Sequence, residues 1–222
     1  MNKRKVGVFD SGVGGLSVAK AIQLAVPDLD VQYAHDREHV PYGDKTPEQL
    51  LGFVVPILQK LVDEGCRCII IACNTVTTTL IGQLRELISV PLIGMEPMVK
   101  PAAEQTYTGI IAVCATPGTL KSERYQWLKH TYATDKKVLE PDCSRWSYMI
   151  EHNVIEDEYI ARQIDELCDA GADVIVLGCT HYHWIEQKIR AMAKGRAVVI
   201  QPEPAVIRQL QHILEEGSVV KS

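Results

Sequence analysis

Short apolar runs alternate with amphipathic segments along the whole chain. Each run is bounded by glycine, proline or polar residues, a pattern typical of strands buried on both faces of a sheet. The predicted strands span residues 6–9, 29–34, 68–72, 90–94, 110–114, 137–140, 174–177 and 197–200. The segments between them carry apolar residues at helical spacing. Strands and helices that alternate in this way predict a parallel α/β architecture.

Several predicted helices have clear ends or a clear buried face. Thr46, Pro47 and Gln49 form an N-terminal signature for a helix that runs to about Glu64 and stops at Gly65. Further helices are predicted over 120–129, 148–151 and 156–170, and the last one reaches residue 216. The helix that follows residue 75 has an apolar face formed by Leu80, Leu84, Leu87 and Ile88.

Two of the predicted strands end in similar polar sequences, 106 positions apart. Residues 68–72 run into Cys73-Asn74-Thr75, and residues 174–177 run into a turn that contains Cys179. The same offset relates the turn at 7–12 to the turn at 113–118. We therefore predict two pseudo-symmetric parallel-sheet α/β domains, residues 1–96 and 97–204, with the active site in the interdomain cleft. The C-terminal helix, 205–222, is expected to pack back on the first domain.

Composition and charge narrow the class of protein. The chain has 222 residues, of which 46% are hydrophobic and 23% charged, values ordinary for a globular protein. A net charge of −5 speaks against a nucleic-acid surface, and no apolar run approaches the roughly 20 residues of a membrane span. Seven cysteines without disulfide-like spacing favour the cytoplasm. Five of them are interpreted as buried core residues, namely Cys66, Cys68, Cys114, Cys143 and Cys168.

Cys73 and Cys179 have a different setting from the other five. Each follows a buried strand and precedes a helical segment, which is where open α/β sheets bind ligands, and a helix N-terminus there favours a thiolate. Two thiols that face each other across a cleft suit a reaction in which one takes a proton from a carbon and the other returns one to the opposite face. Asp10 is expected to assist Cys73, and His181 to assist Cys179.

The polar residues at the other strand ends suit a small ligand. The turn at residues 10–15 reads D-S-G-V-G-G, which lacks the spacing of a dinucleotide loop, and its leading Asp10 would repel a pyrophosphate. Short uncharged donors suit the carboxylate and ammonium groups of an amino acid. They are supplied by Ser11, Asn74, Thr75, Thr116, Thr119 and Thr180.

Four motifs in order, at residues 9–16, 41–43, 72–75 and 178–182, resemble the signature set of the glutamate racemases within the aspartate/glutamate racemase superfamily. The resemblance implies cofactor-independent interconversion of L- and D-glutamate for peptidoglycan synthesis, in a homodimer. It assigns Cys73 and Cys179 as the acid/base pair, assisted by Asp10 and His181. The substrate contacts that it implies are Ser11, Pro41, Tyr42, Gly43, Asn74, Thr75, Thr116, Thr119 and Thr180.

The chain departs from the family pattern in segments expected around the cleft. The family has a proline and apolar residues where this chain has 144–148, a proline where it has His183, and a polar Asp/Ser element near Gln201. An aspartate or broad-specificity amino-acid racemase, or a catalytically silent binding or regulatory homologue, therefore stays as an alternative. Glu151 fits an acidic position of the family and equally fits a surface carboxylate.

Some candidate residues also have structural interpretations. Asp10 is suited to capping the helix that follows it, and His181 to a buried structural role. Cys179, His181 and His183 are residue types that bind zinc. Alternating positions beside a strand need an irregular turn to converge, and no fourth ligand follows nearby. We therefore expect neither a metal nor a cofactor in the site.

Overall fold

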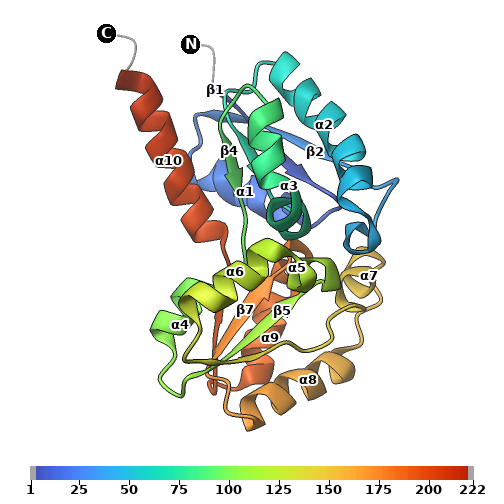
Figure 1. Ribbon diagram of the computed structural model, residues 1–222, viewed down its shortest axis with the longest axis vertical. Helices are drawn as coiled ribbons and strands as arrows, with labels where there is room; N and C mark the ends of the chain where they lie inside the picture. The colour runs from blue at the N-terminus through green and yellow to red at the C-terminus, as the bar shows by residue number, and fades with distance from the viewer. Residues whose placement is uncertain (1–3, 220–222) are drawn as a thin grey trace.

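The structure, a computed structural model, describes residues 4–219, with side chains to residue 215. It contains two four-stranded parallel sheets, one above the other in Figure 1, with strand orders β2-β1-β3-β4 and β6-β5-β7-β8. The first sheet is formed by β1 (Arg4–Asp10), β2 (Leu29–His35), β3 (Ile69–Ile71) and β4 (Leu92–Gly94). The second is formed by β5 (Ile110–Ala115), β6 (Lys137–Leu139), β7 (Val174–Gly178) and β8 (Val198–Ile200). The predicted strands and the pseudo-symmetric α/β fold are confirmed, since the two sheets repeat one order.

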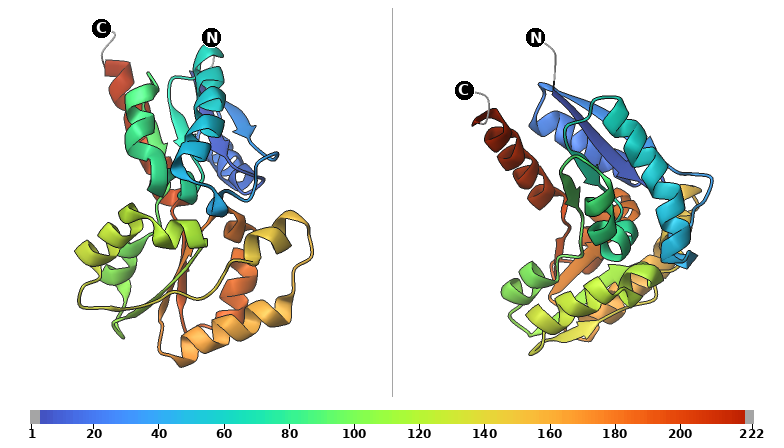
Figure 2. Two further views of the ribbon diagram at one scale, coloured as in Figure 1. Left: turned by 45° about the vertical axis from the view of Figure 1, so that its right-hand side comes forward. Right: turned by 45° about the horizontal axis from the view of Figure 1, so that its top comes forward.

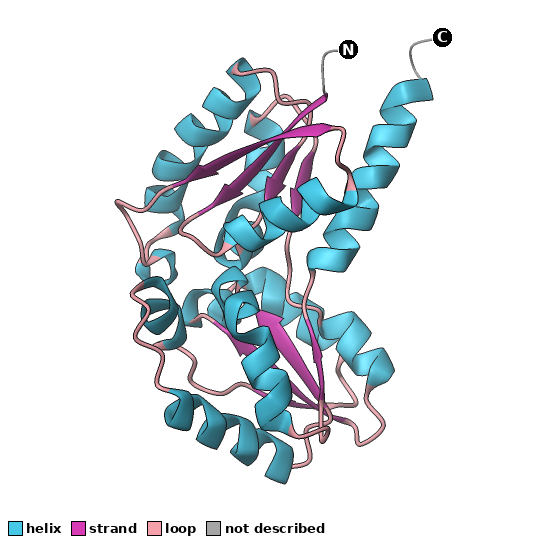
Figure 3. Cartoon of the chain, turned by 180° about the vertical axis from the view of Figure 1, so that it is seen from behind, coloured by secondary structure: helices cyan, strands magenta, loops and turns pink. Residues whose placement is uncertain are grey.

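Helices cover both faces of each sheet (Figure 3). The helices of the first half are α1 (Gly15–Ala25), η1 (Tyr42–Asp44), α2 (Pro47–Asp63) and α3 (Asn74–Leu87). The later ones are α4 (Val99–Gln105), α5 (Pro117–Lys121), α6 (Glu123–Tyr132), α7 (Trp146–Glu151), α8 (Asp157–Asp169), η2 (Thr180–Ile185), α9 (Glu186–Ala193) and α10 (Glu203–Val219). Each sheet therefore has two apolar cores, as the continuous apolar strands require.

The strand register places the functional turns together. In the first sheet Phe9 pairs with Ile71, so Asp10, the last residue of β1, and Cys73, just after β3, stand at neighbouring strand ends. In the second sheet Ala115 pairs with Gly178, so Thr116 and Cys179 do the same. Because parallel strands share one carboxyl edge, each half gathers its polar turns at a single edge.

The local signals for α2 are confirmed. The Thr46 hydroxyl accepts a hydrogen bond from the Gln49 backbone N–H, the Gln49 side chain accepts one from the Thr46 N–H, and Pro47 opens the helix. Gly65, with φ of 89°, follows the helix end in a left-handed conformation that glycine adopts without strain.

Three details differ from the sequence-based expectation. The predicted helix over 120–129 is two helices, α5 and α6, because the Ser122 hydroxyl caps the start of α6 and interrupts the run. Leu87 was predicted on a buried face but is 54% exposed, since α3 ends there, whereas Leu80 and Leu84 are buried. The seven-residue α4 is absent from the prediction because so short a helix has too few apolar positions to show a period.

The C-terminal helix lies against the first half of the chain (Figure 2). Val206 and Leu210 of α10 are buried in one apolar cluster with Val6, Val8 and Ile22. Residues 220–222 of the expected helix lie outside the described residues. Within residues 4–219, no helix is long and apolar enough to cross a membrane.

Candidate active site

A cavity of about 420 Å³ is lined by residues of both halves of the molecule. Twelve of the fourteen predicted site residues line it: Ser11, Pro41, Tyr42, Gly43, Cys73, Asn74, Thr75, Thr116, Glu151, Cys179, Thr180 and His181. The other two, Asp10 and Thr119, are fully buried and hydrogen-bond to residues of the cavity wall. The two cysteines thus line one cavity, as the two-cysteine hypothesis requires.

Cys73 stands between β3 and the first residue of α3. Its Sγ lies 3.5 Å from the Ser11 hydroxyl. Burial, reinforced by the Asp10 charge, raises the pKa of this thiol to about 12, although a backbone hydrogen bond in the first turn of α3 acts in the opposite direction. The expectation that the helix N-terminus favours a thiolate here is therefore wrong, because desolvation outweighs the dipole. In the free protein at neutral pH, Cys73 is a thiol.

Cys179 is the first member of a chain of three polar side chains. Its Sγ lies 3.8 Å from His181 Nδ1, and His181 Nε2 lies 2.7 Å from the Glu151 carboxylate. Burial lowers the pKa of His181, but hydrogen bonds with Cys179 and Glu151 outweigh it and raise the pKa to about 11. The hydrogen bond from His181 lowers the pKa of Glu151. An imidazolium therefore lies between the Glu151 carboxylate and the Cys179 sulfur.

Asp10 connects the two halves from behind the cavity wall. One carboxylate oxygen accepts a hydrogen bond from the backbone N–H of Gly15, the first residue of α1, at 2.7 Å. The other accepts one from the Thr180 hydroxyl of the second half at 3.3 Å. Burial raises the pKa of Asp10, with the His181 charge opposing it. Asp10 therefore holds the first residue of α1, although the N-cap of that helix is Gly14 and not Asp10 as one interpretation expected, and its charge raises the pKa of Cys73.

Uncharged polar groups line the side of the cavity near α3 and α5. The Thr75 hydroxyl lies 3.0 Å from that of Thr116 and 3.3 Å from that of Thr119. Asn74 is only 2% exposed, and neither its amide oxygen nor its amide nitrogen has a hydrogen-bond partner. A buried amide without partners is costly unless a ligand supplies them. Asn74 is therefore suited to binding a polar group inside the cavity.

Sequence reasoning did not identify several residues of the site. Asp36, only 7% exposed, accepts hydrogen bonds from the Tyr42 hydroxyl at 2.7 Å and from His39 at 2.8 Å, and so fixes Tyr42 in the cavity wall. It belongs to the polar loop after residue 34, but no spacing marked it. The other wall residues without a sequence signal are Val40, Asp44, Pro117 and His152, whereas Ser144, Ser147 and Tyr148 belong to the segment 144–148 that was expected around the cleft.

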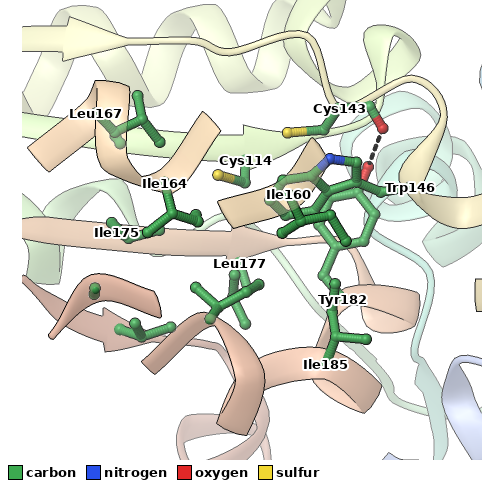
Figure 4. Close-up of a cluster of buried hydrophobic side chains, with 14 of the residues drawn as sticks. Cys114, Cys143, Trp146, Ile160, Ile164, Leu167, Ile175, Leu177, Tyr182 and Ile185 are labelled. Carbon is green, nitrogen blue, oxygen red and sulfur yellow. Dashed lines mark hydrogen bonds between the residues drawn. The ribbon is translucent and has the colours of Figure 1, made fainter. Parts of the chain in front are cut away.

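The core of the second half holds α7 against η2. Trp146 packs edge-on against Tyr182, with ring centroids 5.0 Å apart, and the Tyr182 hydroxyl donates to the Cys143 carbonyl (Figure 4). Cys114 and Cys143 are fully buried in the same cluster, as expected of structural cysteines, whereas Cys168 is only partly buried.

The zinc-ligand interpretation finds no matching geometry. Among the described side chains, no three histidine, cysteine, aspartate or glutamate residues are grouped so that they could hold a metal ion. Both ring nitrogens of His183 are buried without a hydrogen-bond partner, and burial lowers the pKa of that ring to about 4.

Comparison with known proteins agrees with this geometry. The sequence model of the Asp/Glu/Hydantoin racemase family matches residues 14–210. The chain belongs to this family. Within it, the chain is 37% identical to the glutamate racemase of Pseudomonas syringae over 222 residues, covering 98% of this chain and 81% of that protein.

Solved structures of racemases have the same fold as this family member. The Escherichia coli glutamate racemase, crystallised with L-glutamate and the activator UDP-MurNAc-ala, superposes with a TM-score of 0.89 at 29% identity, over 96% of this chain and 83% of that one. The Francisella tularensis glutamate racemase, solved with D-glutamate, gives 0.81 at 28% identity, over 98% and 83%. Both enantiomers of one amino acid thus bind to proteins with this fold.

Proposed function

We propose that this protein is a glutamate racemase that moves protons at Cα with two cysteines and no cofactor. The observation that carries the proposal is the common cavity of Cys73 and Cys179, which follow strands of different sheets and so approach a ligand from different halves. The similarity to glutamate racemases over nearly the whole chain supports glutamate as the substrate.

The two cysteines act on opposite faces of Cα. In one direction Cys179, which lies beside His181, takes the Cα proton from one enantiomer, while Cys73 gives its proton to the opposite face of the same carbon. The product leaves Cys179 protonated and Cys73 as a thiolate. The reverse reaction runs through the same two sulfurs with their roles exchanged.

The uncharged donors of the cavity serve as the substrate contacts. Asn74 has both amide atoms available, and Thr75, Thr116 and Thr180, which carry hydroxyls, line the same cavity. Such groups bind carboxylates without adding a fixed positive charge. Tyr42, held by Asp36, and the backbone of Gly43 line the cavity beside Thr116, and Thr119 and Asp10 hold the wall from behind.

Hydrogen exchange in deuterated buffer tests the proposal directly. We expect L-glutamate to lose its circular dichroism and gain one deuterium at Cα, and D-glutamate to do the same. Cys73→Ala and Cys179→Ala should each lower racemisation by about 10²–10⁴-fold, whereas Cys168→Ala, at a partly buried cysteine outside the cavity, serves as the matched control. Exchange with aspartate instead of glutamate would support the alternative substrate. No exchange with any amino acid would support a silent binding homologue.

The wider biological setting is proposed on the same basis. We propose domain boundaries at residues 96 and 204, supported by the two separate sheets. A homodimer and a role in supplying D-glutamate for peptidoglycan follow from the resemblance to the family. The seven cysteines, all unpaired, support the cytoplasm. Sedimentation of the purified protein would test the dimer.

A further inference from the structure

Each of the two cavity sulfurs has one serine hydroxyl beside it. Ser11 Oγ lies 3.5 Å from Cys73 Sγ, and Ser147 Oγ lies 3.6 Å from Cys179 Sγ. Ser11 belongs to a family motif, but Ser147 lies in the segment where this chain departs from the family pattern. The two serines do not occupy equivalent positions of the internal repeat. What they share is a hydroxyl group beside a sulfur.

Helix α7 holds Ser147 in this place. Ser147 and Glu151 are four residues apart, on one face of α7, so the helix presents a hydroxyl to Cys179 and a carboxylate to His181. The orientation of α7 is fixed by the fully buried Trp146, whose Nε1 donates to Gln163 at 2.8 Å and whose ring packs on Tyr182 (Figure 4). Because the core fixes the helix, the hydroxyl is held at the sulfur.

We propose that Ser147 is a positioning residue for Cys179, an inference that rests on the proposed two-cysteine reaction. Its hydroxyl donates a hydrogen bond to the Cys179 thiolate and accepts one from the thiol. The serine keeps its own proton throughout, since the proton that moves is the one shared between Cα and sulfur. With His181 on one side and Ser147 on another, the sulfur is directed into the cavity in both protonation states.

The alkylation of each cysteine by iodoacetamide, measured against pH on the free protein and resolved by peptide mass, tests this assignment. A hydrogen bond donated to a thiolate stabilises it, so the loss of that donor raises the pH midpoint at which the cysteine is alkylated. We expect Ser147→Ala to raise the midpoint at Cys179 by about one pH unit and to leave that at Cys73 unchanged. Ser11→Ala should raise the midpoint at Cys73 and leave that at Cys179 unchanged. Ser147→Thr keeps the hydroxyl and should restore the wild-type midpoint at Cys179.

Ser144→Ala is the matched control. Ser144 lines the same cavity from the turn before α7, but its backbone N–H and its hydroxyl both hydrogen-bond to Asp142. It should leave the Cys179 midpoint unchanged. An unchanged midpoint at Cys179 in Ser147→Ala, an equal shift at both cysteines, or the same shift in Ser144→Ala would each overturn the assignment.

Racemisation gives a second measurement. We expect Ser147→Ala to lower kcat about tenfold, the equivalent of one pKa unit, with little change in KM, and Ser147→Thr to recover most of it. An unchanged kcat in Ser147→Ala would overturn the positioning role even if the alkylation midpoint moved. If the protein racemises no amino acid, the proposed function is refuted. Alkylation needs no substrate, so it would still show whether Ser147 acts on Cys179.

Discussion

The carboxylate of Glu151 lies 2.7 Å from Nε2 of His181, although 30 positions separate the two residues in the chain. The contact joins α7 to η2, and through His181 it reaches the Cys179 sulfur. Arg37, from the loop after β2, lies 3.6 Å from the other Glu151 oxygen. Glu151 therefore connects the site to both halves of the molecule, and its removal should affect stability as well as chemistry.

Replacing Glu151 by glutamine should lower the thermal stability in a limited pH range. Because the folded pKa of Glu151 is below its ordinary 4.5, its stabilising effect is present above pH 4.5 and is lost as the pH falls through the folded value. The pKa of His181 is raised from 6.5 to about 11, so its contribution is complete below pH 6.5 and is lost as the pH rises toward 11. The difference in Tm between wild type and Glu151→Gln should be largest from pH 4.5 to 6.5.

Thermal unfolding from pH 3 to pH 10 measures this profile. Glu158→Gln, at an exposed glutamate in the first turn of α8, is the control for loss of a carboxylate. A difference between Glu151→Gln and wild type that stays constant at all these pH values would contradict a stabilising ion pair.

Gly14 should be the position least tolerant of a methyl group at the boundary between the halves. A Cβ there would lie 2.7 Å from the backbone nitrogen of His181 and 2.7 Å from the Thr180 hydroxyl. Its φ of −55° suits any residue, so the effect of Gly14→Ala is steric and not conformational. To relieve these contacts η2 would move away and displace His181. We expect racemisation to fall at least tenfold, which corresponds to the interaction energy of about one pKa unit or more.

Gly52 provides the control for this substitution. It lies inside α2, where an added Cβ would meet no atom within 4 Å. Gly52→Ala should therefore raise the free energy of unfolding by up to about 1 kcal/mol, because alanine favours the helix. Racemase assays and urea unfolding of both variants separate the two effects. Wild-type activity in Gly14→Ala would show that η2 moves without consequence.

The fold could be predicted from the sequence because its strands are buried on both faces and therefore form continuous apolar runs. Runs such as the three isoleucines of β3 have no other good interpretation in a chain that alternates strands and helices. The two misjudged elements have different causes. Ser122 caps α6 through a local hydrogen bond with the Tyr125 N–H, which the continuous run of helix formers concealed. Helix α4 depends on tertiary contacts, since Val99 and Ala102 pack on a core, and local spacing does not show that influence.

The candidate site was predictable where a residue type and a strand end coincide. Cys73 and Cys179 stand at such positions with His181 close behind, the register places each at the carboxyl edge of its own sheet, and the two halves together form one cavity around them. Asp36 and Ser147 were not predictable, since each acts through a contact made by folding. The pKa of Cys73 was misjudged for the same reason: local position indicates the helix dipole, but only the packed structure shows the desolvation.

Asn74 should combine a cost in stability with a gain in binding. Its two amide atoms are buried without partners, so the isosteric change Asn74→Leu should raise the free energy of unfolding of the ligand-free protein by about 1 kcal/mol. The same change should raise KM for glutamate by at least tenfold, since about 1.4 kcal/mol of lost hydrogen bonding has that effect. Thr77 is the control on the same helix, because its hydroxyl bonds Ile71 and Met95. In urea unfolding, Asn74→Leu should stabilise the protein and Thr77→Val should destabilise it. If both changes lower the free energy of unfolding, Asn74 has a structural role.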